Sequence, residues 1–356
     1  MENHRRFPSL TLSEIHQQPE TWPATLAIVE KHPATARLKA FRDGAVISGA
    51  GSSAYAAGAV AEAWRSARAI PTTDLVTEDL GSFSGTRIML SLARSGNSPE
   101  SVAAVERMLK FQPLVEHFAI TCNAEGRLAQ QPGVTAIALD PRTNDQGLAM
   151  TSSFSNLVLA GLCMSHGAEL SGALPALCGL VADSLPALSE HAESFAKIMR
   201  QRVIVLASSP LLFCAREAAL KILELTAGRI AVLTETFLGL RHGPMSFLDR
   251  DTAILAFVSS DPKTRRYEID VLAELRSKKL GISLGILPSS CDQTVVDDAI
   301  PAMAENLPDY LRTPFEIVYG QLLAYHLSRR VGLDPDHPSP SGVISRVVQG
   351  VTIYAD

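Results

Sequence analysis

The sequence predicts an α/β protein with two doubly wound parallel sheets. From about residue 43 onward, short and nearly continuous apolar runs alternate with helical segments. This alternation is typical of parallel sheets whose strands are buried on both faces. It occurs twice along the chain, and 356 residues are enough for two domains. The hydrophobic share of 46% and the charged share of 19% fit a well-buried globular protein.

The first half contains the clearest elements. Residues 1–42 predict outer helices, one beginning within residues 13–18 and another containing "PATLAIVEKH". "AVISGAG" predicts a strand that ends in glycines, and the helix "SSAYAAGAVAEAWRSAR" follows it. "RIMLSLA" predicts a second buried strand, followed by the amphipathic helix "SPESVAAVERMLKF" with a proline in its first turn. "HFAITCN" and "VTAIALD" predict two further strands.

The second half repeats this pattern after a helical stretch at residues 152–200. "RVIVLASSPLLFCAREAALKILEL" and "TAILAFVSSDPKTRRYEIDVLAEL" again read as strand, turn and helix. We therefore predict an internal duplication, with domains at residues 43–200 and 201–330. Residues 1–42 form a helical segment in this scheme, and residues 331–356 form a tail that closes the site. Only the first half keeps a glycine–serine turn after its second strand.

Composition narrows the partners and the compartment. A net charge of −5 does not indicate the basic surface that nucleic-acid-binding proteins use. Five widely spaced cysteines without a C-x-x-C pair indicate reduced thiols rather than a disulfide framework or a metal site. The amino terminus lacks the apolar core of a signal peptide, and the apolar stretch "QGLAMTSSFSNLVLAGLCMSHGA" is broken by polar residues. We expect a cytoplasmic protein without a membrane partner or a metal.

Two polar loops follow neighbouring strands of the first half and open helices. Open α/β sheets bind ligands at this edge, where helix N-termini attract anions. Glycines let the backbone approach a ligand, hydroxyls donate hydrogen bonds, and a guanidinium fits phosphate geometry. Serine caps with turn glycines would explain either loop alone, but the two together favour a monophosphate site. Its candidate residues are Gly51, Ser52, Ser53, Arg94, Ser95 and Ser98.

A dinucleotide site is the weaker alternative. "GAGSSA" fits the loose dinucleotide fingerprint, and Asp74 lies about 20 residues further on, as that fingerprint expects. However, no apolar strand is expected to lead into Asp74, and the second serine loop has no role in that scheme.

A third candidate region lies in the second half. Glu217, Lys221 and Glu224 are spaced i, i+4 and i+7 and so share one helix face. "RHGP" then places His242 in a rigid polar turn. A solvated salt-bridge face and an ordinary loop histidine would explain these residues. With a carboxylate nearby, however, His242 could serve in acid–base catalysis.

Taken together, "SGAGSSAYAAG", "ARSGNSPES", "AMTSSF", "REAALKILELTAG" and "RHGP" resemble the sugar isomerase (SIS) family. The resemblance is closest to its AgaS-type galactosamine-6-phosphate deaminase/isomerase branch, also called tagatose-6-phosphate ketose/aldose isomerase. "PTTDLVT", "ITCNAEGRL" and "SGVISRVVQGVTIY" support this branch, and the similarity spans residues 14–354. The chain is also similar to the isomerase half of glucosamine-6-phosphate synthase.

The resemblance implies roles for individual residues. Glu224 matches the carboxylate that moves a proton between C1 and C2, and Lys221 matches a neighbouring lysine. His242 matches the histidine that opens the sugar ring, supplied in that relative by the partner subunit. Gln349 stands where the synthase has an essential lysine. Further residues are expected to hold the phosphate or face the sugar: Ser52, Ser53, Arg94, Ser95, Ser98, Ala149 and Thr151.

The expected function is deamination of galactosamine 6-phosphate to tagatose 6-phosphate and ammonia, without a cofactor, by a homodimer or homotetramer with a shared active site. A plain aldose–ketose isomerase, a glucosamine-6-phosphate deaminase and a non-catalytic sugar-phosphate sensor remain alternatives. Amidotransfer from glutamine is not expected, because no amino-terminal glutaminase domain headed by a cysteine is present in this sequence.

Overall fold

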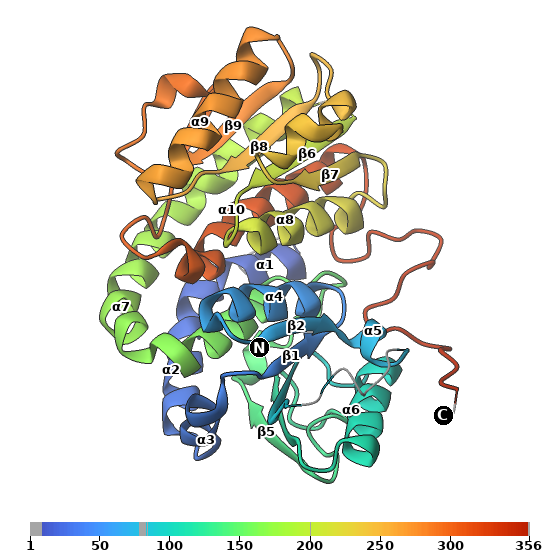
Figure 1. Ribbon diagram of the computed structural model, residues 1–356. Coiled ribbons are helices and arrows are strands. Elements are labelled where there is room, and N and C mark those ends of the chain that lie inside the picture. Colours follow the sequence, from blue (N-terminus) through green and yellow to red (C-terminus); the bar gives the residue numbers. More distant parts are fainter. Residues whose placement is uncertain (1–8, 78–82, 84, 200, 355–356) are drawn as a thin grey trace. The chain divides into compact units, whose positions relative to one another are not determined.

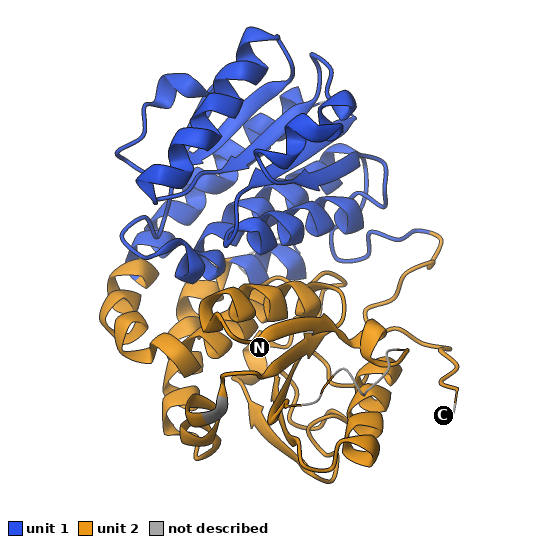
Figure 2. Cartoon of the chain, viewed as in Figure 1, with its two compact units in different colours: residues 1–15, 179–340 blue, residues 16–178, 341–356 orange. Residues whose placement is uncertain are grey.

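The computed structural model describes residues 9–77, 83, 85–199 and 201–354 (Figure 1). The chain forms two compact units, coloured separately in Figure 2. Unit 1 comprises residues 1–15 and 179–340, and unit 2 comprises residues 16–178 and 341–356. These units divide the chain at other positions than the predicted domains. In particular, the predicted tail, residues 331–356, is divided. Residues 331–340 belong to unit 1, and the remaining tail, Ser341–Asp356, belongs to unit 2 with the first half of the chain.

Unit 2 contains a parallel five-stranded sheet with the order β2-β1-β3-β4-β5. Its strands are β1 (Val46–Gly49), β2 (Arg68–Pro71), β3 (Ile88–Ala93), β4 (Glu116–Thr121) and β5 (Val134–Ala138). Every residue of the central strand β3 is buried, as its unbroken apolar run predicts. The chain runs from β1 to the edge strand β2, returns past β1 to the central strand β3, and continues to β4 and the other edge strand, β5, which is the doubly wound topology. In a sheet of this order, right-handed crossovers put the helix before the reversal at β2 and the helices after it on opposite faces.

The helices of unit 2 begin with α2, which is anchored to α7. Trp22 donates a hydrogen bond to the Ser155 hydroxyl at 3.0 Å, and Thr25 donates to Asn156 Oδ1 at 2.7 Å. All four of these side chains are buried, so the predicted outer helices contribute to the core. The unit's helices and short 3-10 turn are α2 (Gln18–Lys31), α3 (Ala34–Phe41), α4 (Ser52–Trp64), α5 (Thr72–Leu75), α6 (Pro99–Phe111), η3 (Pro141–Thr143) and the first part of α7 (Ser152–Ile198).

The long helix α7 is a single element by its hydrogen bonds, but its backbone is kinked at His166, where φ is −131° and ψ is 32°. Residues 152–164, which precede the kink, are all buried. Among the described residues, α7 is the one helix long and apolar enough, by length and composition, to cross a membrane. The 18-residue window that meets this criterion is 28% buried. Residues 152–164, which lie in the stretch predicted as a buried helix, are all buried.

Unit 1 contains a second parallel five-stranded sheet, with the order β10-β9-β8-β6-β7. In chain order its strands follow the same path as those of unit 2. The chain runs from β6 to the edge strand β7, returns past β6 to the central strand β8, and continues to β9 and the other edge strand, β10. They are β6 (Arg202–Ala207), β7 (Ala231–Glu235), β8 (Ala253–Phe257), β9 (Ile282–Leu287) and β10 (Asp298–Pro301). The predicted fold class, two doubly wound parallel sheets, is therefore confirmed.

The helices of unit 1 include a closely packed pair, α8 and α10. Gly320 permits this approach, because a Cβ at this position would lie 2.7 Å from the Cβ of Ala218. Helix α1 is held by Asp336, whose carboxylate accepts hydrogen bonds from the backbone amides of Leu10 and Thr11 at 2.8 Å each. The helices and 3-10 turns are α1 (Leu10–His16), α8 (Leu212–Leu225), η4 (Gly239–His242), η5 (Pro244–Phe247), α9 (Pro262–Ser277), η6 (Gln293–Val295) and α10 (Asp309–Arg330).

One strand of unit 2 was not predicted from the sequence. A strand, β2, does lead into the segment that contains Asp74. It is a largely exposed edge strand of four residues, Arg68–Pro71, and it therefore lacks the apolar run that sequence patterns detect. Asp74 itself is exposed in α5, where it accepts a hydrogen bond from the hydroxyl of the neighbouring Thr73.

Candidate functional site

The loop after β1 is shaped by two glycines. A Cβ on Gly49 would lie 2.4 Å from the backbone carbonyl carbon of Ser53, so no side chain fits there. Gly51 has φ +58° and ψ −127°, a conformation that favours glycine. The tight turn places Ser52 and Ser53 at the start of α4, where both are buried. The Ser53 hydroxyl lies 3.8 Å from the sulfur of Met150.

The loop after β3 leaves the same edge of the sheet, because β1 and β3 are parallel neighbours. Its backbone is held by the segment that follows β4. Asn123 Nδ2 donates to the Ser95 carbonyl at 3.0 Å, and the Leu128 amide donates to the Gly96 carbonyl at 2.9 Å. A Cβ on Gly126 would lie 2.4 Å from the Ser95 carbonyl oxygen. Asn123 and Gly126 therefore support the serine loop, a role that was not predicted from the sequence.

Helix α6 begins at this loop with Ser98 as its N-cap residue. Among the described residues, the Ser98 side chain makes no capping hydrogen bond. The hydroxyl of Ser95 accepts a hydrogen bond from the Asn97 amide at 3.2 Å, an ordinary local turn contact. Within the described part of the chain, no side-chain hydrogen bond caps the start of α6, although Glu100 lies in its first turn, and a serine hydroxyl is placed beside the positive end of the helix dipole.

Arg94 is buried and directs its guanidinium at backbone carbonyls. Nη1 donates to the Gly147 and Leu148 carbonyls at 3.3 and 3.0 Å, and Nη2 donates to the Arg346 carbonyl at 2.5 Å. These contacts fix both the segment before Ala149 and the tail. Arg94 therefore positions two other parts of unit 2, and its direct contact with a phosphate stays a prediction.

Asp145 organises the loop that contains Ala149 and Thr151. One carboxylate oxygen accepts hydrogen bonds from the Thr151 and Ser153 amides at 2.8 Å each, and from the Ser153 hydroxyl at 2.5 Å. Burial raises the Asp145 pKa, and these hydrogen bonds oppose that rise. Ala149 and Thr151 are both buried. Asp145 was not predicted; the only signal is one acidic residue shortly before "AMTSSF".

The C-terminal tail is fastened to this loop by Arg346. Its Nε donates to the Asp145 carbonyl at 2.7 Å, and its Nη2 donates to Asn144 Oδ1 at 2.7 Å. Gln349, three residues further on, is exposed. The tail thus lies against the loop next to Ala149 and Thr151, within unit 2.

Helix α8 of unit 1 carries a buried lysine between two glutamates. Lys221 Nζ lies 3.3 Å from Glu217 Oε1 and donates to Glu224 Oε2 at 2.5 Å. Burial disfavours the ammonium, but the two carboxylates outweigh it and raise the Lys221 pKa. The side chains of Lys221 and Glu217 are 0% exposed, whereas that of Glu224 is 26% exposed. Glu224 is therefore the member of this cluster that can reach a substrate.

His242 ends the turn η4 and is exposed. The following Gly243 has φ +120°, which redirects the chain into Pro244. The neighbouring Arg241 donates from Nε to Glu274 Oε2 on α9 at 2.6 Å, and this contact holds the turn. Glu274 is a supporting residue that the sequence did not indicate.

The predicted residues thus gather separately in each unit. Unit 2 brings the two serine loops, the buried loop of Ala149 and Thr151, and the tail to the carboxyl edge of its sheet. In unit 1, Lys221 and Glu224 are in contact, whereas His242 lies on a different loop. Among the described residues, no group of three or more His, Cys, Asp or Glu could hold a metal ion.

The comparisons with known proteins agree with this arrangement. No family model matches the chain. It is 34% identical over 368 residues to D-galactosamine-6-phosphate deaminase AgaS from Escherichia coli O157:H7, covering 97% of this chain and 95% of that protein. The crystal structure of tagatose-6-phosphate ketose/aldose isomerase from Escherichia coli matches with a TM-score of 0.85 and 31% identity, covering 98% and 97% of the two chains.

A more distant structure shares the fold alone. The C-terminal domain of glucosamine-fructose-6-phosphate aminotransferase from Francisella tularensis has a TM-score of 0.78 at 18% identity, and the match covers 93% of this chain and 98% of that domain. Near-complete coverage at more than 30% identity, together with the same two-sheet architecture, establishes the relationship. The chain belongs to the AgaS family of galactosamine-6-phosphate deaminases, within the sugar isomerase fold.

Proposed function

We propose that this protein deaminates galactosamine 6-phosphate, giving tagatose 6-phosphate and ammonia. The observation that carries the proposal is the cluster on α8, in which a buried charged lysine orients one partly exposed glutamate. Such a carboxylate can remove a proton next to a carbonyl and return it to the neighbouring carbon. The family membership supplies the substrate class, since the relative from Escherichia coli O157:H7 is a deaminase of this sugar phosphate.

The chemistry follows from the open-chain sugar, which has an aldehyde at C1 and an amine at C2. Glu224 removes the C2 proton, and the electron pair moves through C1 onto the aldehyde oxygen, which takes up a proton from solvent to give an enaminol. A proton delivered to C1 then leaves a hydroxymethyl group at C1 and an imine at C2. Water adds to C2, the C–N bond breaks, and ammonia leaves the ketose. We assign Glu224 Oε1 to the moving proton, because Lys221 holds Oε2.

General acid–base catalysis of this kind accelerates a reaction by about 10²–10⁴.

We assign phosphate binding to the loops of unit 2. The hydroxyls of Ser52, Ser53, Ser95 and Ser98, together with the N-termini of α4 and α6, provide donors for a phosphate at the carboxyl edge of the sheet. Arg94 contributes its charge there and positions the segment that leads to Ala149 and Thr151. We assign Gln349 to the sugar, because Arg346 fastens the tail to that segment. Holding the phosphate supplies positional binding energy away from the reacting carbons.

We further propose that the protein is cytoplasmic and that its two units arose by internal duplication. We also propose that it forms a homodimer or homotetramer whose subunits share active sites. His242 would open the sugar ring in the partner's site, for which its exposure on a rigid turn is suited. Mixing two inactive variants, His242→Asn and Glu224→Gln, tests this. If the sites are shared, hybrid dimers formed at equal concentrations contain one intact site each and restore about a quarter of wild-type activity. If each chain uses its own His242, mixing restores nothing.

The substrate is tested by measuring ammonia and ketose phosphate with galactosamine 6-phosphate, glucosamine 6-phosphate and N-acetylgalactosamine 6-phosphate. Equimolar ammonia and tagatose 6-phosphate, formed fastest from galactosamine 6-phosphate, would support the proposal. Faster release from glucosamine 6-phosphate would change the substrate but keep the reaction.

A second function fits the same residues. The matched structure from Escherichia coli is a ketose/aldose isomerase, and the C2-to-C1 proton transfer serves isomerisation equally well. Interconversion of aldose and ketose phosphates without ammonia from any amino sugar would favour this function. Binding of sugar phosphate with neither reaction would favour a non-catalytic sensor.

A further inference from the structure

The loop after β8 in unit 1 has the same place in its sheet as the serine loop after β3 has in unit 2. Both loops follow the central strand, leave the carboxyl edge of a parallel sheet and open a helix, α9 or α6. The loop after β8 presents Ser259 and Ser260, and no assigned activity uses it. It therefore has the topology of an anion-binding loop.

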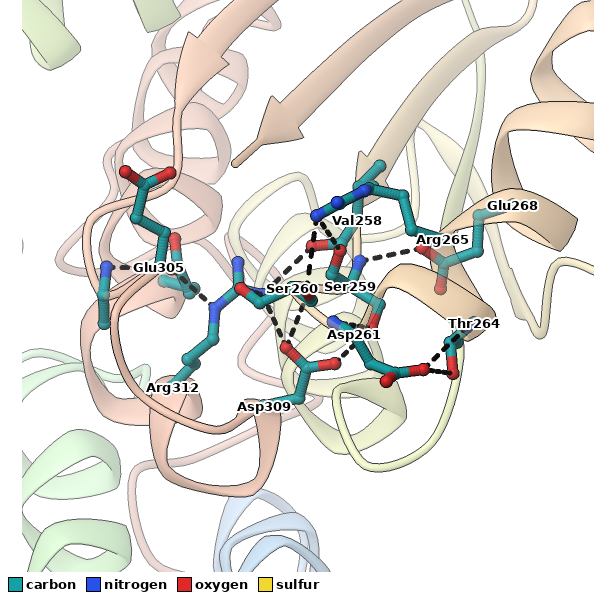
Figure 3. Close-up of polar contacts among 12 residues, drawn as sticks. Val258, Ser259, Ser260, Asp261, Thr264, Arg265, Glu268, Glu305, Asp309 and Arg312 are labelled. Atoms are coloured by element: carbon teal, nitrogen blue, oxygen red, sulfur yellow. Dashed lines mark hydrogen bonds and ion pairs between the residues drawn. The ribbon is translucent and has the colours of Figure 1, made fainter. Parts of the chain in front are cut away.

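In this loop, however, a carboxylate of the same chain is already bound (Figure 3). Asp309, the first residue of α10, accepts a hydrogen bond from the Ser260 amide at 2.9 Å. The same oxygen accepts from Arg312 Nη1 at 2.8 Å, and the other accepts from the Ser259 hydroxyl. One backbone amide, one hydroxyl and one guanidinium are the donors that proteins use for phosphate and sulfate.

The guanidinium is built into the loop and has donor capacity to spare. Arg312 is 0% exposed. Its Nη1 also donates to the Val258 carbonyl at 3.1 Å and to the Ser260 hydroxyl at 2.9 Å, while Nε pairs with Glu316 at 3.1 Å. Its Nη2 is buried and has no hydrogen-bond partner among the described residues.

Two more charged groups border the loop. Arg265 Nη1 lies 3.3 Å from the Ser260 carbonyl. Glu268 accepts from the Ser259 amide at 2.8 Å, and burial raises its pKa, which favours the neutral form. The N-terminus of the following helix, α9, is capped as well, because the Asp261 carboxylate accepts a hydrogen bond from the Thr264 amide at 2.8 Å. In unit 2 the corresponding helix α6 has no side-chain cap among the described residues.

We propose that unit 1 contains an oxyanion-binding cradle that is permanently filled by the Asp309 carboxylate. The intact unit 1 then binds no phosphate at this loop, whereas loss of the carboxylate creates a site for inorganic phosphate or sulfate. This inference rests on the contacts within unit 1 and does not depend on the proposed catalytic function.

The test compares Asp309→Ala with a matched control, Asp297→Ala. Asp297 also lies in unit 1 and accepts from one backbone amide and one serine hydroxyl, both of Ser283, at 2.8 and 2.9 Å. Among the described residues, Asp297 forms no ion pair with an arginine. Both variants lose one hydrogen bond from a backbone amide and one from a serine hydroxyl. Asp309→Ala also loses the hydrogen bond from Arg312 Nη1, which leaves a buried guanidinium open to an anion.

Thermal unfolding is measured for wild type and both variants with and without inorganic phosphate. At ten times its dissociation constant, phosphate shifts the folding equilibrium about elevenfold. For a unit of this size, that shift corresponds to a Tm rise of about 3–6 °C. We expect this rise for Asp309→Ala beyond whatever wild type and Asp297→Ala show. Equilibrium dialysis should find one more phosphate per chain in Asp309→Ala than in wild type.

An equal response of all three proteins, with no additional phosphate bound, would overturn the proposal. If Asp309→Ala is not folded in buffer free of oxyanions, refolding in phosphate is the readout, and recovery there supports the proposal. Asp309→Ser provides the second variant, since serine is tolerated at a helix start and leaves most of the carboxylate volume empty. Failure of phosphate to stabilise either variant would contradict the filled-cradle account.

Discussion

Replacing Lys221 by methionine removes the positive charge from the cluster on α8 and keeps much of the side chain's volume. Glu217 then remains as a fully buried carboxylate without its cation, while Glu224 can still reach water. Breaking a buried ion pair by removing one partner costs about 3–5 kcal/mol, because the other charge stays buried. We expect Lys221→Met to lower the free energy of unfolding by about this amount at pH 8.

The loss of unfolding free energy caused by Lys221→Met should become smaller as the pH falls. In the wild type the Lys221 pKa is raised, so the lysine stays charged throughout the neutral range and its stabilisation is lost only in strong base. In the variant, the buried Glu217 favours its protonated form, so destabilisation should shrink as pH falls from 8 to 5. The double variant Glu217→Gln/Lys221→Met removes both charges and should recover most of the loss.

Urea unfolding followed by far-ultraviolet circular dichroism is the appropriate assay. Both tryptophans, Trp22 and Trp64, lie in unit 2, so their fluorescence would not report unit 1. Lys197→Met is the matched control, since it breaks an exposed i, i+4 pair with Glu193 and should cost about 0.5 kcal/mol or less. A loss of unfolding free energy below about 1 kcal/mol for Lys221→Met, or no recovery in the double variant, would show that Lys221 does not compensate a buried charge on Glu217.

Three further predictions concern unit 2. Gly49→Ala places a Cβ 2.4 Å from the Ser53 backbone and should destabilise the unit by about 1–3 kcal/mol. In the control Gly172→Ala nothing lies within 4 Å of the new Cβ, so this change should be neutral or stabilising. Thermal unfolding distinguishes the two variants. Burial lowers the pKa of His117 to about 4 from 6.5, so the unfolded chain takes up the proton first and stability is lost as pH falls from 6.5 toward 4, by up to ~3 kcal/mol. His117→Leu should remove this loss in urea unfolding between pH 7 and 4.5. Arg346→Met breaks the hydrogen bonds that fasten the tail, so amide hydrogen exchange in the tail should accelerate about tenfold or more, while exchange in α8 stays unchanged.

The main elements of the fold could be predicted because they carry strong local patterns. The buried central strand β3 is an unbroken apolar run, and α6 combines a proline at its start with amphipathic spacing. The edge strand β2 was missed because three of its four residues are exposed and no apolar run marks it. Strands β7, β9 and β10 were not predicted individually.

The residues of the candidate site also differ in whether a local sequence pattern marks them. Residues with a motif, such as the serines of both loops and the triplet on α8, could be selected from spacing and chemistry. Supporting residues carry no such pattern. Asp145 acts through the amides of Thr151 and Ser153, and Glu274 holds the turn before His242 from a different helix. Arg94 could be chosen as a charge beside the loop, but only the tertiary structure shows its guanidinium donating to backbone carbonyls.

The most direct measurement is ammonia release from galactosamine 6-phosphate by wild type and Glu224→Gln, with binding of the sugar phosphate measured in parallel. Glu193→Gln is the control, because Glu193 also pairs with a lysine on its own helix but is exposed on α7. We expect Glu224→Gln to lose at least about 10²-fold in kcat while still binding the sugar phosphate. Glu193→Gln should release ammonia at the wild-type rate. Undiminished ammonia release by Glu224→Gln would contradict the assignment of proton transfer to Glu224.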